Sequence, residues 1–536
     1  MSDEIADVLI IGAGASGGVV ARRLALEGFK VVCLEQGEWP DRTKFRGSHD
    51  DWELTARKQW SADPNIRSLK CDYPIDSSQS DITPLMFNGV GGSMTLFAGT
   101  WPRMLPSDFR VRSLDGVADD WPITYSELAP YYDSVDQEFG ISGLSGDTFF
   151  PSQNEYPLPP LPLGKAGMKV ALGHNKLGWH WWVEPNAILS KPYKGRNQCV
   201  QRGVCTSGCG EGAKASADLT HFPDAIKAGA KVITGARVRE ITTSKSGLAT
   251  GAIWLDKEKG EHHQKAKIVI MASNAIGTAR LLLLSKSPRF ADGLANSSGL
   301  VGRRLMMHTF SVVTGYFPES LGTWQGHFGA SITSYEFYET DKSRGFVRGA
   351  KWALSPVGGP LGHVLPQRAG KAVWGPEHHK YVADHFGKGA SWAIFGEDLP
   401  DVENRVEIDS TLKDDFGIPA PRVIYKLSSN SKKIASFNAD RAEESLLASG
   451  AKSVTKDVLL PYSGWHLMGT ARMGDDPSTS VLDKYSRSHD VPNLFVVDGS
   501  QFVTSSGVNP TSTITALALR AAENIIKTRS SIPVPL

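Results

Sequence analysis

A group of closely spaced glycines near the N-terminus has the residue types and spacing needed to bind a dinucleotide. The sequence GAGASG (12–17) follows an apolar stretch at 6–11 and precedes a helical stretch at 19–28. Its glycines permit a tight turn, close approach of the backbone to a pyrophosphate, and close helix–strand packing. Glu35 ends the next apolar stretch, 23 positions after Gly12, where it can accept hydrogen bonds from ribose hydroxyls. This order predicts a dinucleotide-binding βαβ unit, and a nucleotide-free α/β domain is the alternative.

Three cysteines lie close together in the chain, and their thiols could serve several kinds of chemistry. Cys199, Cys205 and Cys209 follow the spacing C-x5-C-x3-C. A zinc site would need a fourth ligand, for which His221 is the only nearby candidate. A disulfide is disfavoured, because five cysteines in the whole chain are few and odd in number. An iron–sulfur cluster and a purely structural glycine-rich loop both remain open.

The bulk composition excludes several classes of protein. The 536 residues are 40% hydrophobic and 21% charged, which suits a large folded core. A net charge of +1 argues against a nucleic-acid partner or a polybasic membrane patch. No apolar run reaches the roughly 18 residues that span a bilayer. The acidic N-terminus MSDEIADVLIIGAG leads into a strand, not an export signal, so we expect a cytoplasmic protein without a transmembrane segment.

The pattern along the chain predicts an α/β protein with a Rossmann-like nucleotide-binding domain and a second domain. We expect the first domain over residues 1–309, with a proline-rich excursion near 150–195. Residues 310–460 alternate short strands with Gly, Pro and Trp, which favours a substrate domain built on a largely antiparallel sheet. Residues 461–536 return to α/β style, with a buried strand and a helix that rejoin the first domain.

Motifs at both ends of the chain carry a family resemblance. Besides GAGASGG and Glu35, they are GVGGSMTLFAGTWPR (89–103), DDWPITYSELAPYYDSVDQEFGISG (119–143), WHLMGTARMG (465–474), NLFVVDGS (493–500) and GVNPTSTITALALRAAENI (507–525). Together they resemble the GMC (glucose-methanol-choline) family of FAD oxidoreductases. Within that family the chain looks nearest to the bacterial sugar and glucoside dehydrogenases and the pyranose-oxidase-like branch. Residues 310–460 show only weak resemblance.

The resemblance implies a set of residues around FAD. Some would hold its ADP half, some would pass near the pyrophosphate and the flavin, and the start of the helix at 510–527 would face the pyrimidine edge. The cofactor-binding residues implied are Gly12, Gly14, Ala15, Ser16, Gly17, Glu35, Gln36, Gly91, Gly92, Ser93, Met94, Val238, Asp498, Gly499, Asn509, Pro510 and Thr511.

Two positions depart from the family pattern. Pyranose-oxidase-like relatives can carry a histidine bonded to FAD in the loop after the paired glycines, and Leu96 stands at that place here. Leucine cannot form such a bond, so we predict non-covalent FAD. The second departure is Met307, which stands where the family motif before His308 has an aspartate.

Alcohol oxidation by a flavin needs hydride transfer from the carbinol carbon to flavin N5 and a base for the hydroxyl proton, and histidine suits that base near neutral pH. His466 matches the family's catalytic histidine, and Asn509, 43 positions later, matches its second catalytic residue. An asparagine there would donate a hydrogen bond to the substrate oxygen. A single histidine is more commonly structural, but the flanking motif and Asn509 favour catalysis. His308 is a weaker candidate for a supporting role.

Substrate and electron acceptor follow only from subfamily similarity. We predict oxidation of a secondary alcohol, with a sugar or glycoside favoured and an aromatic or terpenoid alcohol as the alternative. A non-catalytic flavin-binding electron-relay protein is the alternative of another class. Flavin glucose and fructose dehydrogenases have a similar three-cysteine loop that binds a [3Fe–4S] cluster, while steroid and fatty-alcohol members have a similar structural loop. With a cluster, electrons would leave to a partner protein or small subunit, as in a dehydrogenase; without one, oxygen or a diffusible acceptor would reoxidise FAD directly.

Overall fold

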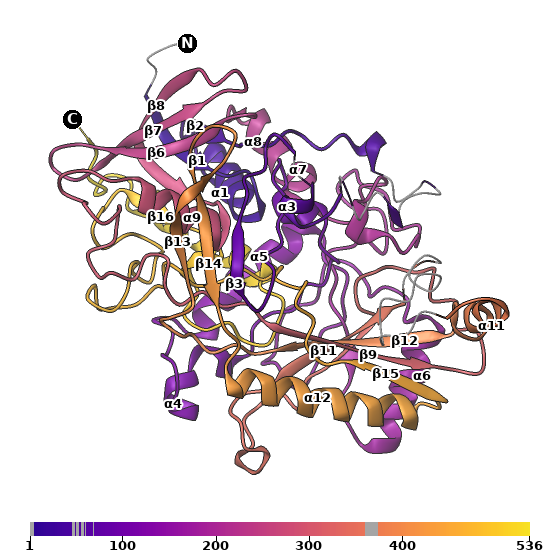
Figure 1. Ribbon diagram of the computed structural model, residues 1–536. Coiled ribbons are helices and arrows are strands. Elements are labelled where there is room, and N and C mark those ends of the chain that lie inside the picture. The colour runs from indigo at the N-terminus through magenta and orange to yellow at the C-terminus, as the bar shows by residue number, and fades with distance from the viewer. Residues whose placement is uncertain are drawn as a thin grey trace.

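The computed structural model describes residues 5–535, except for 46–48, 50–52, 55–57, 59, 68, 358 and 360–372. Two large sheets lie in separate parts of the molecule (Figure 1). The first sheet gathers strands from the N-terminal half together with one strand near the C-terminus, whereas the second draws mainly on the middle of the chain. The chain therefore passes from one part to the other and back, as the sequence predicted for an α/β fold with a second, largely antiparallel sheet.

The first sheet is parallel around the N-terminal strand. β1 (Ala6–Ile11) pairs in parallel with β2 (Val31–Leu34) on one side and β8 (Glu261–Met271) on the other. β1 and β2 are almost wholly buried, which explains their near-continuous apolar sequence. The remaining strands are β5 (Lys231–Ile233), β6 (Arg237–Thr243), β7 (Ala249–Leu255) and β16 (Leu494–Val496).

Helix α1 (Ala15–Leu26) connects β1 to β2 and packs against α13 (Thr511–Lys527), the last helix of the chain. α13 also packs against α5 (Tyr125–Phe139), which starts with a capping box between Thr124 and Glu127. The C-terminal helix is thus held against the N-terminal βαβ unit. This contact brings segments from the two ends of the chain side by side.

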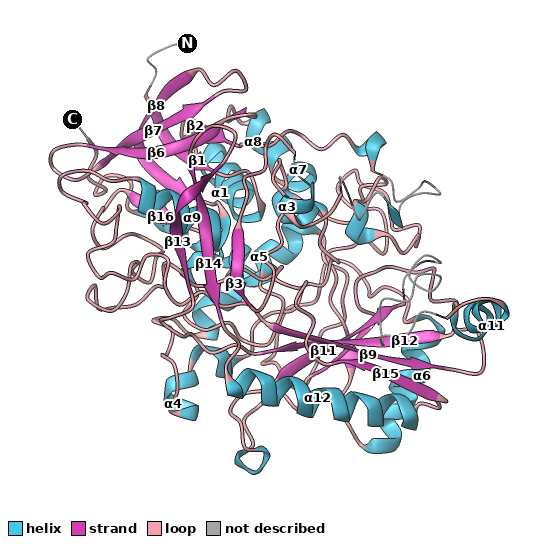
Figure 2. Cartoon of the chain, viewed as in Figure 1, coloured by secondary structure: helices cyan, strands magenta, loops and turns pink. Residues whose placement is uncertain are grey.

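The second sheet has two chemically different faces because its side chains alternate. β9 (Thr309–Tyr316) and β12 (Gly389–Gly396) pair antiparallel at its centre. One face, which includes Val313, packs on α12 (Ser429–Ala448), the long helix that lies along the sheet in Figure 2. The opposite face is left for the cavity described below. The other strands are β4 (Trp182–Val183), β10 (Ile332–Ser334), β11 (Ala350–Pro356) and β15 (Ser453–Asp457).

The three sheets do not follow the predicted domain ranges strictly. β4 lies within the proline-rich excursion, yet it pairs with β10 at the edge of the second sheet. β13 (Arg405–Lys413) and β14 (Pro419–Tyr425) form a hairpin that pairs with β3 (Asp76–Ser80) in a third, small sheet. This hairpin packs against α9 (Asn274–Leu284) of the first part. The domain limits that we placed at residues 309 and 460 therefore stay predictions.

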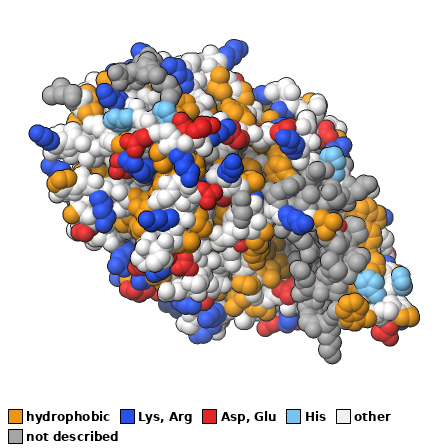
Figure 3. Space-filling view, turned by 45° about the horizontal axis from the view of Figure 1, so that its top comes forward, with side chains coloured by type: hydrophobic (Ala, Val, Ile, Leu, Met, Phe, Trp, Pro, Cys, Tyr) orange, Lys and Arg blue, Asp and Glu red, His pale blue; other side chains and the backbone are white. Residues whose placement is uncertain are grey.

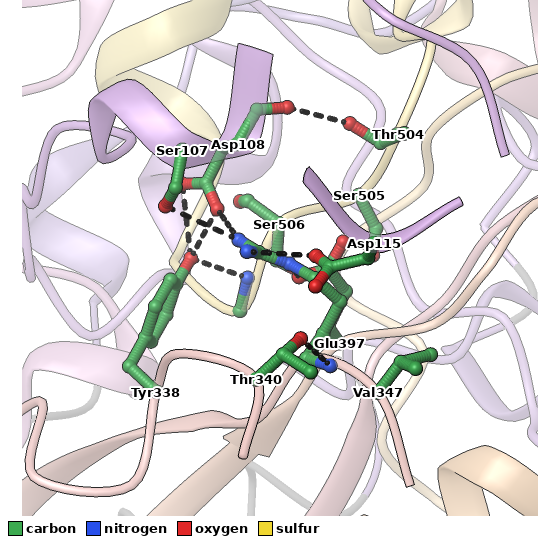
Figure 4. A network of polar contacts seen from close by, with 12 residues as sticks. Ser107, Asp108, Asp115, Tyr338, Thr340, Val347, Glu397, Thr504, Ser505 and Ser506 are labelled. Atoms are coloured by element: carbon green, nitrogen blue, oxygen red, sulfur yellow. Dashed lines mark hydrogen bonds and ion pairs between the residues drawn. The ribbon is translucent and has the colours of Figure 1, made fainter. Parts of the chain in front are cut away.

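A buried polar network ties the two parts together (Figure 4). Arg348, almost fully buried, binds Asp108 of the first part at 2.5 Å and Glu397 of the second at 2.9 Å. Tyr338 donates to Asp108 at 3.0 Å and accepts from the Gly507 N–H at 2.8 Å. Burial raises the pKa of both Asp108 and Glu397. The network anchors the loop that leads to Asn509.

The surface carries mixed charge. Figure 3 shows Lys and Arg side chains interspersed with Asp and Glu over the face that it displays. Among the described residues, no helix combines the length and apolar character needed to cross a bilayer.

Candidate active site

One continuous cavity of about 790 Å³ runs between the first and second sheets. It is lined by the N-terminal glycine loop, the loop after Gly91, the C-terminal segment and one face of the second sheet. Of the predicted cofactor-binding residues, Gly17 and Gly91 are not among those that line it. The predicted residues that line the cavity are His466, Gly12, Gly14, Ala15, Ser16, Glu35, Gln36, Gly92, Ser93, Met94, Val238, Asp498, Gly499, Asn509, Pro510 and Thr511.

Two glycine loops meet backbone to backbone at the cavity wall. Gly12 has φ of 108°, and a side chain there would collide with the carbonyl of Ala272. Gly92 has φ of 56°, and an added Cβ would lie 2.8 Å from Gly14 Cα. The Gly91 N–H donates to the Ala13 carbonyl at 2.8 Å, which locks the loops together. A side chain at either position would force these backbone segments apart.

Two buried carboxylates shape these loops as well as line the cavity. Glu35 accepts hydrogen bonds from the Ala13 and Gly37 N–H groups, both at 2.8 Å. Burial raises the pKa of Glu35, and the two N–H bonds oppose that rise. Asp498 accepts from the Ser273 N–H at 2.8 Å. Both acids therefore fix backbone turns at the carboxyl ends of strands, the usual place for ligands in parallel sheets.

Two helices begin at this cavity without a side-chain cap. α1 begins after Gly14 and α13 begins after Pro510, and neither has a capping hydrogen bond from a side chain. The first-turn N–H groups of a helix favour negative charge, such as phosphate or the oxygens of a polar ring. The residues present, two abutting glycine loops and two uncapped helix starts in one elongated cavity, fit a dinucleotide such as FAD.

His466 lies in this cavity within a chain of hydrogen bonds. Its Nε2 atom lies 3.2 Å from the Asn509 Nδ2 atom, and its Nδ1 atom lies 2.9 Å from the His308 Nδ1 atom. The His308 Nε2 atom lies 3.3 Å from the Ser505 carbonyl oxygen. At the other end, the Lys351 ammonium donates to the Asn509 Oδ1 atom at 3.1 Å.

The groups at the two ends of this series of hydrogen bonds determine which atom donates in each bond. The Ser505 carbonyl only accepts, so His308 carries its proton on Nε2 and presents a lone pair on Nδ1. His466 must then donate from Nδ1, which leaves a lone pair on its Nε2 atom. Starting from Lys351, which only donates, the Asn509 oxygen faces the ammonium and its NH₂ faces His466. Both arguments place the basic lone pair of His466 beside the Asn509 amide.

Burial keeps both histidines neutral. It lowers the pKa of His308 to about 4 and that of His466 well below its usual range. The neighbouring His308 and Lys351 lower the pKa of His466 further. A neutral imidazole keeps a lone pair that can accept a proton from a substrate hydroxyl.

Sequence reasoning missed the ion pair behind Asn509. Lys351 lies on β11, and Glu184 follows β4; the two side chains are fully buried and 2.5 Å apart. Burial raises the pKa of Glu184 and lowers that of Lys351, and each partner opposes the shift of the other. Neither residue lies in a recognisable motif, and their separation of 167 positions offers no signal in the sequence.

The exposed face of the second sheet forms the apolar end of the cavity. Alternate residues of β9 and β12 point into it, and Phe310 pairs in register with Phe395. The Phe395 ring lies 5.4 Å from the His466 ring, and Trp465 packs edge-on against Phe310 at 5.2 Å, both between ring centroids. Trp465 is 43% exposed, so it stands at the mouth of the cavity.

The cysteine loop supports the wall of the cavity. Cys199, Cys205 and Cys209 are free thiols, and each sulfur accepts a backbone N–H, from Gln201, Phe328 and Lys214 respectively. Within the described residues, no three His, Cys, Asp or Glu side chains group together as metal ligands. The iron–sulfur prediction thus gains no support from the arrangement of side chains.

Lys214, at the end of the same loop, has a clear structural role. Its buried ammonium donates to the carbonyls of Met94, Thr95 and Phe97 at 3.2, 3.0 and 2.8 Å. Burial lowers the pKa of Lys214 to about 8. Lys214 therefore clamps the segment that carries Leu96 into the cavity wall.

Comparison with known proteins agrees with this architecture. The GMC oxidoreductase family model matches in two parts, residues 184–310 and 400–518. The 2-methyl-1,2-propanediol dehydrogenase of Mycolicibacterium austroafricanum is 43% identical, over 99% of this chain and 97% of its own length. The fructose dehydrogenase large subunit of Gluconobacter japonicus is 31% identical, over 98% of this chain and 99% of its own.

A solved structure shows the same fold. Pyridoxine 4-oxidase from Mesorbium loti superposes with a TM-score of 0.67 at 17% identity, covering 97% of this chain and 99% of its own. The chain is thus an oxidoreductase with a flavoenzyme fold. It belongs to the GMC oxidoreductase family, whose members bind FAD, and the family and fold class predicted from the sequence are confirmed.

Proposed function

We propose that this protein oxidises an alcohol carried on a largely apolar skeleton, with His466 as the base. The observation that carries the proposal is the His466 lone pair, which faces the cavity beside the Asn509 amide and below the aromatic face of the second sheet. A substrate hydroxyl beside the two groups would donate to His466 Nε2 and accept from Asn509 Nδ2, in place of the direct bond between them. General bases of this kind contribute about 10²–10⁴-fold to a rate.

The protein's own residues would bind, orient and deprotonate the alcohol. His466 would take the hydroxyl proton, Asn509 would stabilise charge on the oxygen, and the carbinol carbon would become a carbonyl carbon. FAD, when bound, supplies the acceptor for the hydride that leaves this carbon. We propose that the cavity-lining glycine loops, Glu35, Val238, Asp498 and the start of α13 hold FAD, and that Leu96 leaves it non-covalent.

The cavity lining supports an apolar substrate over a sugar. Phe310 and Phe395 offer no hydrogen bonds to a ring of hydroxyls, and Trp465 offers only its indole N–H. Ser391 is already bonded to Thr314 at 2.6 Å, so its hydroxyl is partly satisfied. Buried hydroxyls without partners cost about 1–3 kcal/mol each, which penalises a sugar here. The 43% identity to a dehydrogenase named for a small branched diol agrees with this preference.

A matched anaerobic titration tests the substrate class. Each apolar alcohol is paired with a polyol of similar size, such as cyclohexanol with myo-inositol, and loss of the visible flavin band is followed at a fixed concentration. We expect the apolar member to reduce the flavin at least ~10-fold faster, because each unpaired hydroxyl costs about one factor of ten. Faster reduction by the polyols would return the assignment to a sugar, the class of the fructose dehydrogenase relative.

The electron acceptor and location are further parts of the proposal. Two full-length relatives are named dehydrogenases, which supports an acceptor other than oxygen. Free thiols at all five cysteines suit the reducing cytoplasm. Peroxide production and dye reduction, measured in one assay, distinguish oxidase from dehydrogenase. The fructose dehydrogenase relative is a large subunit, so co-purification of a small partner subunit is worth testing.

A further inference from the structure

The ion pair between Lys351 and Glu184 is fully buried, where the desolvation of two charges is costly. Both side chains are fully inaccessible. Lys351 lies on β11 and Glu184 directly follows β4, and β10 lies between these two strands in the second sheet. Replacing buried ion pairs with apolar residues is often neutral or stabilising, so such a pair is weak evidence for a role in stability. The pair contacts the hydrogen-bonded series of His308, His466 and Asn509 through the bond from Lys351 to the Asn509 Oδ1 atom.

That contact removes an ambiguity in the active site. An asparagine amide can present either its oxygen or its NH₂ to a neighbour, and a flipped Asn509 would point its oxygen at His466. His466 would then have to carry its proton on Nε2, which would leave no basic lone pair toward the substrate. An ammonium that can only donate holds the amide in the useful orientation.

We propose that Lys351, held by Glu184, is a positioning residue that fixes the Asn509 amide and thereby directs the basic lone pair of His466 toward the substrate. The inference deepens the proposed function and rests on it. The Lys351 charge also polarises the Asn509 amide, which makes its NH₂ a stronger donor to a developing alkoxide. This effect is stronger in the transition state than in the bound alcohol, so it acts on kcat more than on KM.

The charges around His466 predict the direction in which each variant should shift the acid inflection of kcat/KM. His308 and Lys351 act on it directly, Glu184 and Asp147 lie behind Lys351, and Asp398 accepts from the N–H of Met307, next to His308. Lys351→Met removes a positive charge, so the acid inflection of kcat/KM should move up by roughly one pH unit. Glu184→Gln removes the negative charge, so the inflection should move down or stay in place.

The conservative variant and a matched control complete the kinetic test. Lys351→Arg keeps the charge and the donor, so the inflection should stay at the wild-type position. Lys169 lies on α6 (Gly164–Leu177) and pairs with Glu319 at the surface of the part that holds the second sheet. Lys169→Met should leave the pH profile of kcat/KM unchanged. We expect Lys351→Met to lower kcat by about 10–100-fold with KM within about 3-fold, at unchanged flavin content.

A second readout does not depend on turnover. Nitrogen-15 NMR of histidine-labelled holoenzyme, assigned with His466→Gln and His308→Gln, reports which ring nitrogen carries each proton. We expect His466 protonated on Nδ1 in the wild type and a mixture of tautomers in Lys351→Met. A Lys351→Met variant with wild-type tautomers and a wild-type inflection would overturn the proposal. If Lys351→Met does not fold, Glu184→Gln and Lys351→Arg decide it: an upward shift of the inflection in Glu184→Gln, or a displaced inflection in Lys351→Arg, would overturn the proposal, and any other result supports it. If no alcohol reduces the wild type, the proposed function fails, and the NMR result alone decides the role of Lys351.

Discussion

The Nδ1 atoms of His308 and His466 lie 2.9 Å apart, and only one of them can carry the proton. Because His308 donates through Nε2 to the Ser505 carbonyl, its Nδ1 atom is the acceptor. His466 is therefore held in the tautomer that leaves a lone pair on its Nε2 atom, beside the Asn509 amide. A structural histidine thus decides whether the neighbouring histidine can act as a base.

Removing His308 tests this relationship. In His308→Ala, the Nδ1 proton of His466 loses its acceptor, and the ring can turn or change tautomer. Misplacing a catalytic group by about 1 Å can cost 10²-fold, so we expect kcat/KM to fall by about that factor. His262→Ala serves as the control, since His262 pairs with Asp256 in the β7–β8 hairpin. An unchanged kcat/KM in His308→Ala would show that His466 is oriented by other contacts.

Cavity shape should control substrate size. Val312 faces the cavity from β9, in register with Ala393 of β12. Val312→Phe fills this end, so bulky alcohols should show a KM raised by about 10-fold or more, a loss of roughly 1.4 kcal/mol of binding, while the smallest alcohols keep theirs. Steady-state kinetics on a homologous series of alcohols measures this. Leu412→Phe, on the exposed end of β13, is the matched control. An equal loss for all chain lengths would place the substrate elsewhere.

Lys214 should be needed to retain the flavin. Lys214→Met leaves three carbonyls of the 94–97 segment without their donor in a buried site, and each costs about 1–3 kcal/mol. We expect a lower ratio of flavin to protein absorbance after gel filtration, while Lys214→Arg retains part of it. Lys245→Met, at an exposed turn, should keep full flavin content. Full retention in Lys214→Met would argue against the clamp.

A buried histidine in the second part predicts a pH-dependent stability. Burial lowers the pKa of His174 to about 4, and its ring nitrogens contact the His180 carbonyl and the Ser445 hydroxyl. Between pH 6.5 and 4 the unfolded state binds a proton that the native state does not, so this stabilisation is present above pH 6.5 and lost as the pH falls.

Comparison with His174→Gln separates the contribution of His174 to the pH dependence of the unfolding free energy from the contribution of the carboxylates. The wild type should exceed His174→Gln in unfolding free energy at pH 7.5, and the difference should shrink by about 2 kcal/mol at pH 4.5. Urea unfolding at the two pH values measures it. A difference that stays constant with pH would mean that His174 has the same pKa in the native and unfolded states.

Local motifs predicted residues that the structure gathers along one cavity, because each of them shapes its own turn. Gly12 and Gly92 need positive φ, and α13 must begin directly after Pro510. Such local requirements can be recognised in short stretches of sequence. Lys351 and Glu184 meet only because β4 and β11 belong to the same sheet. A two-residue strand such as β4 has no periodicity that the sequence could reveal.

The cysteine loop shows the reverse case. Its spacing suggested a metal, but spacing does not fix where sulfur atoms point. Backbone N–H groups meet Cys199, Cys205 and Cys209, and Lys214 links the loop to the cavity. The same stretch therefore supports the alternative of a structural loop, which the sequence alone left open.

The most direct test of the account is stopped-flow reduction of the flavin under anaerobic conditions with an apolar alcohol, comparing wild type with His466→Ala at equal flavin content. The account predicts rapid loss of the visible flavin band in the wild type and a rate about 10²–10⁴-fold lower in His466→Ala, partly restored by added imidazole. Equal rates in the two proteins would contradict the role of His466. No reduction of the wild type by any alcohol would favour a flavin-binding electron-relay protein instead.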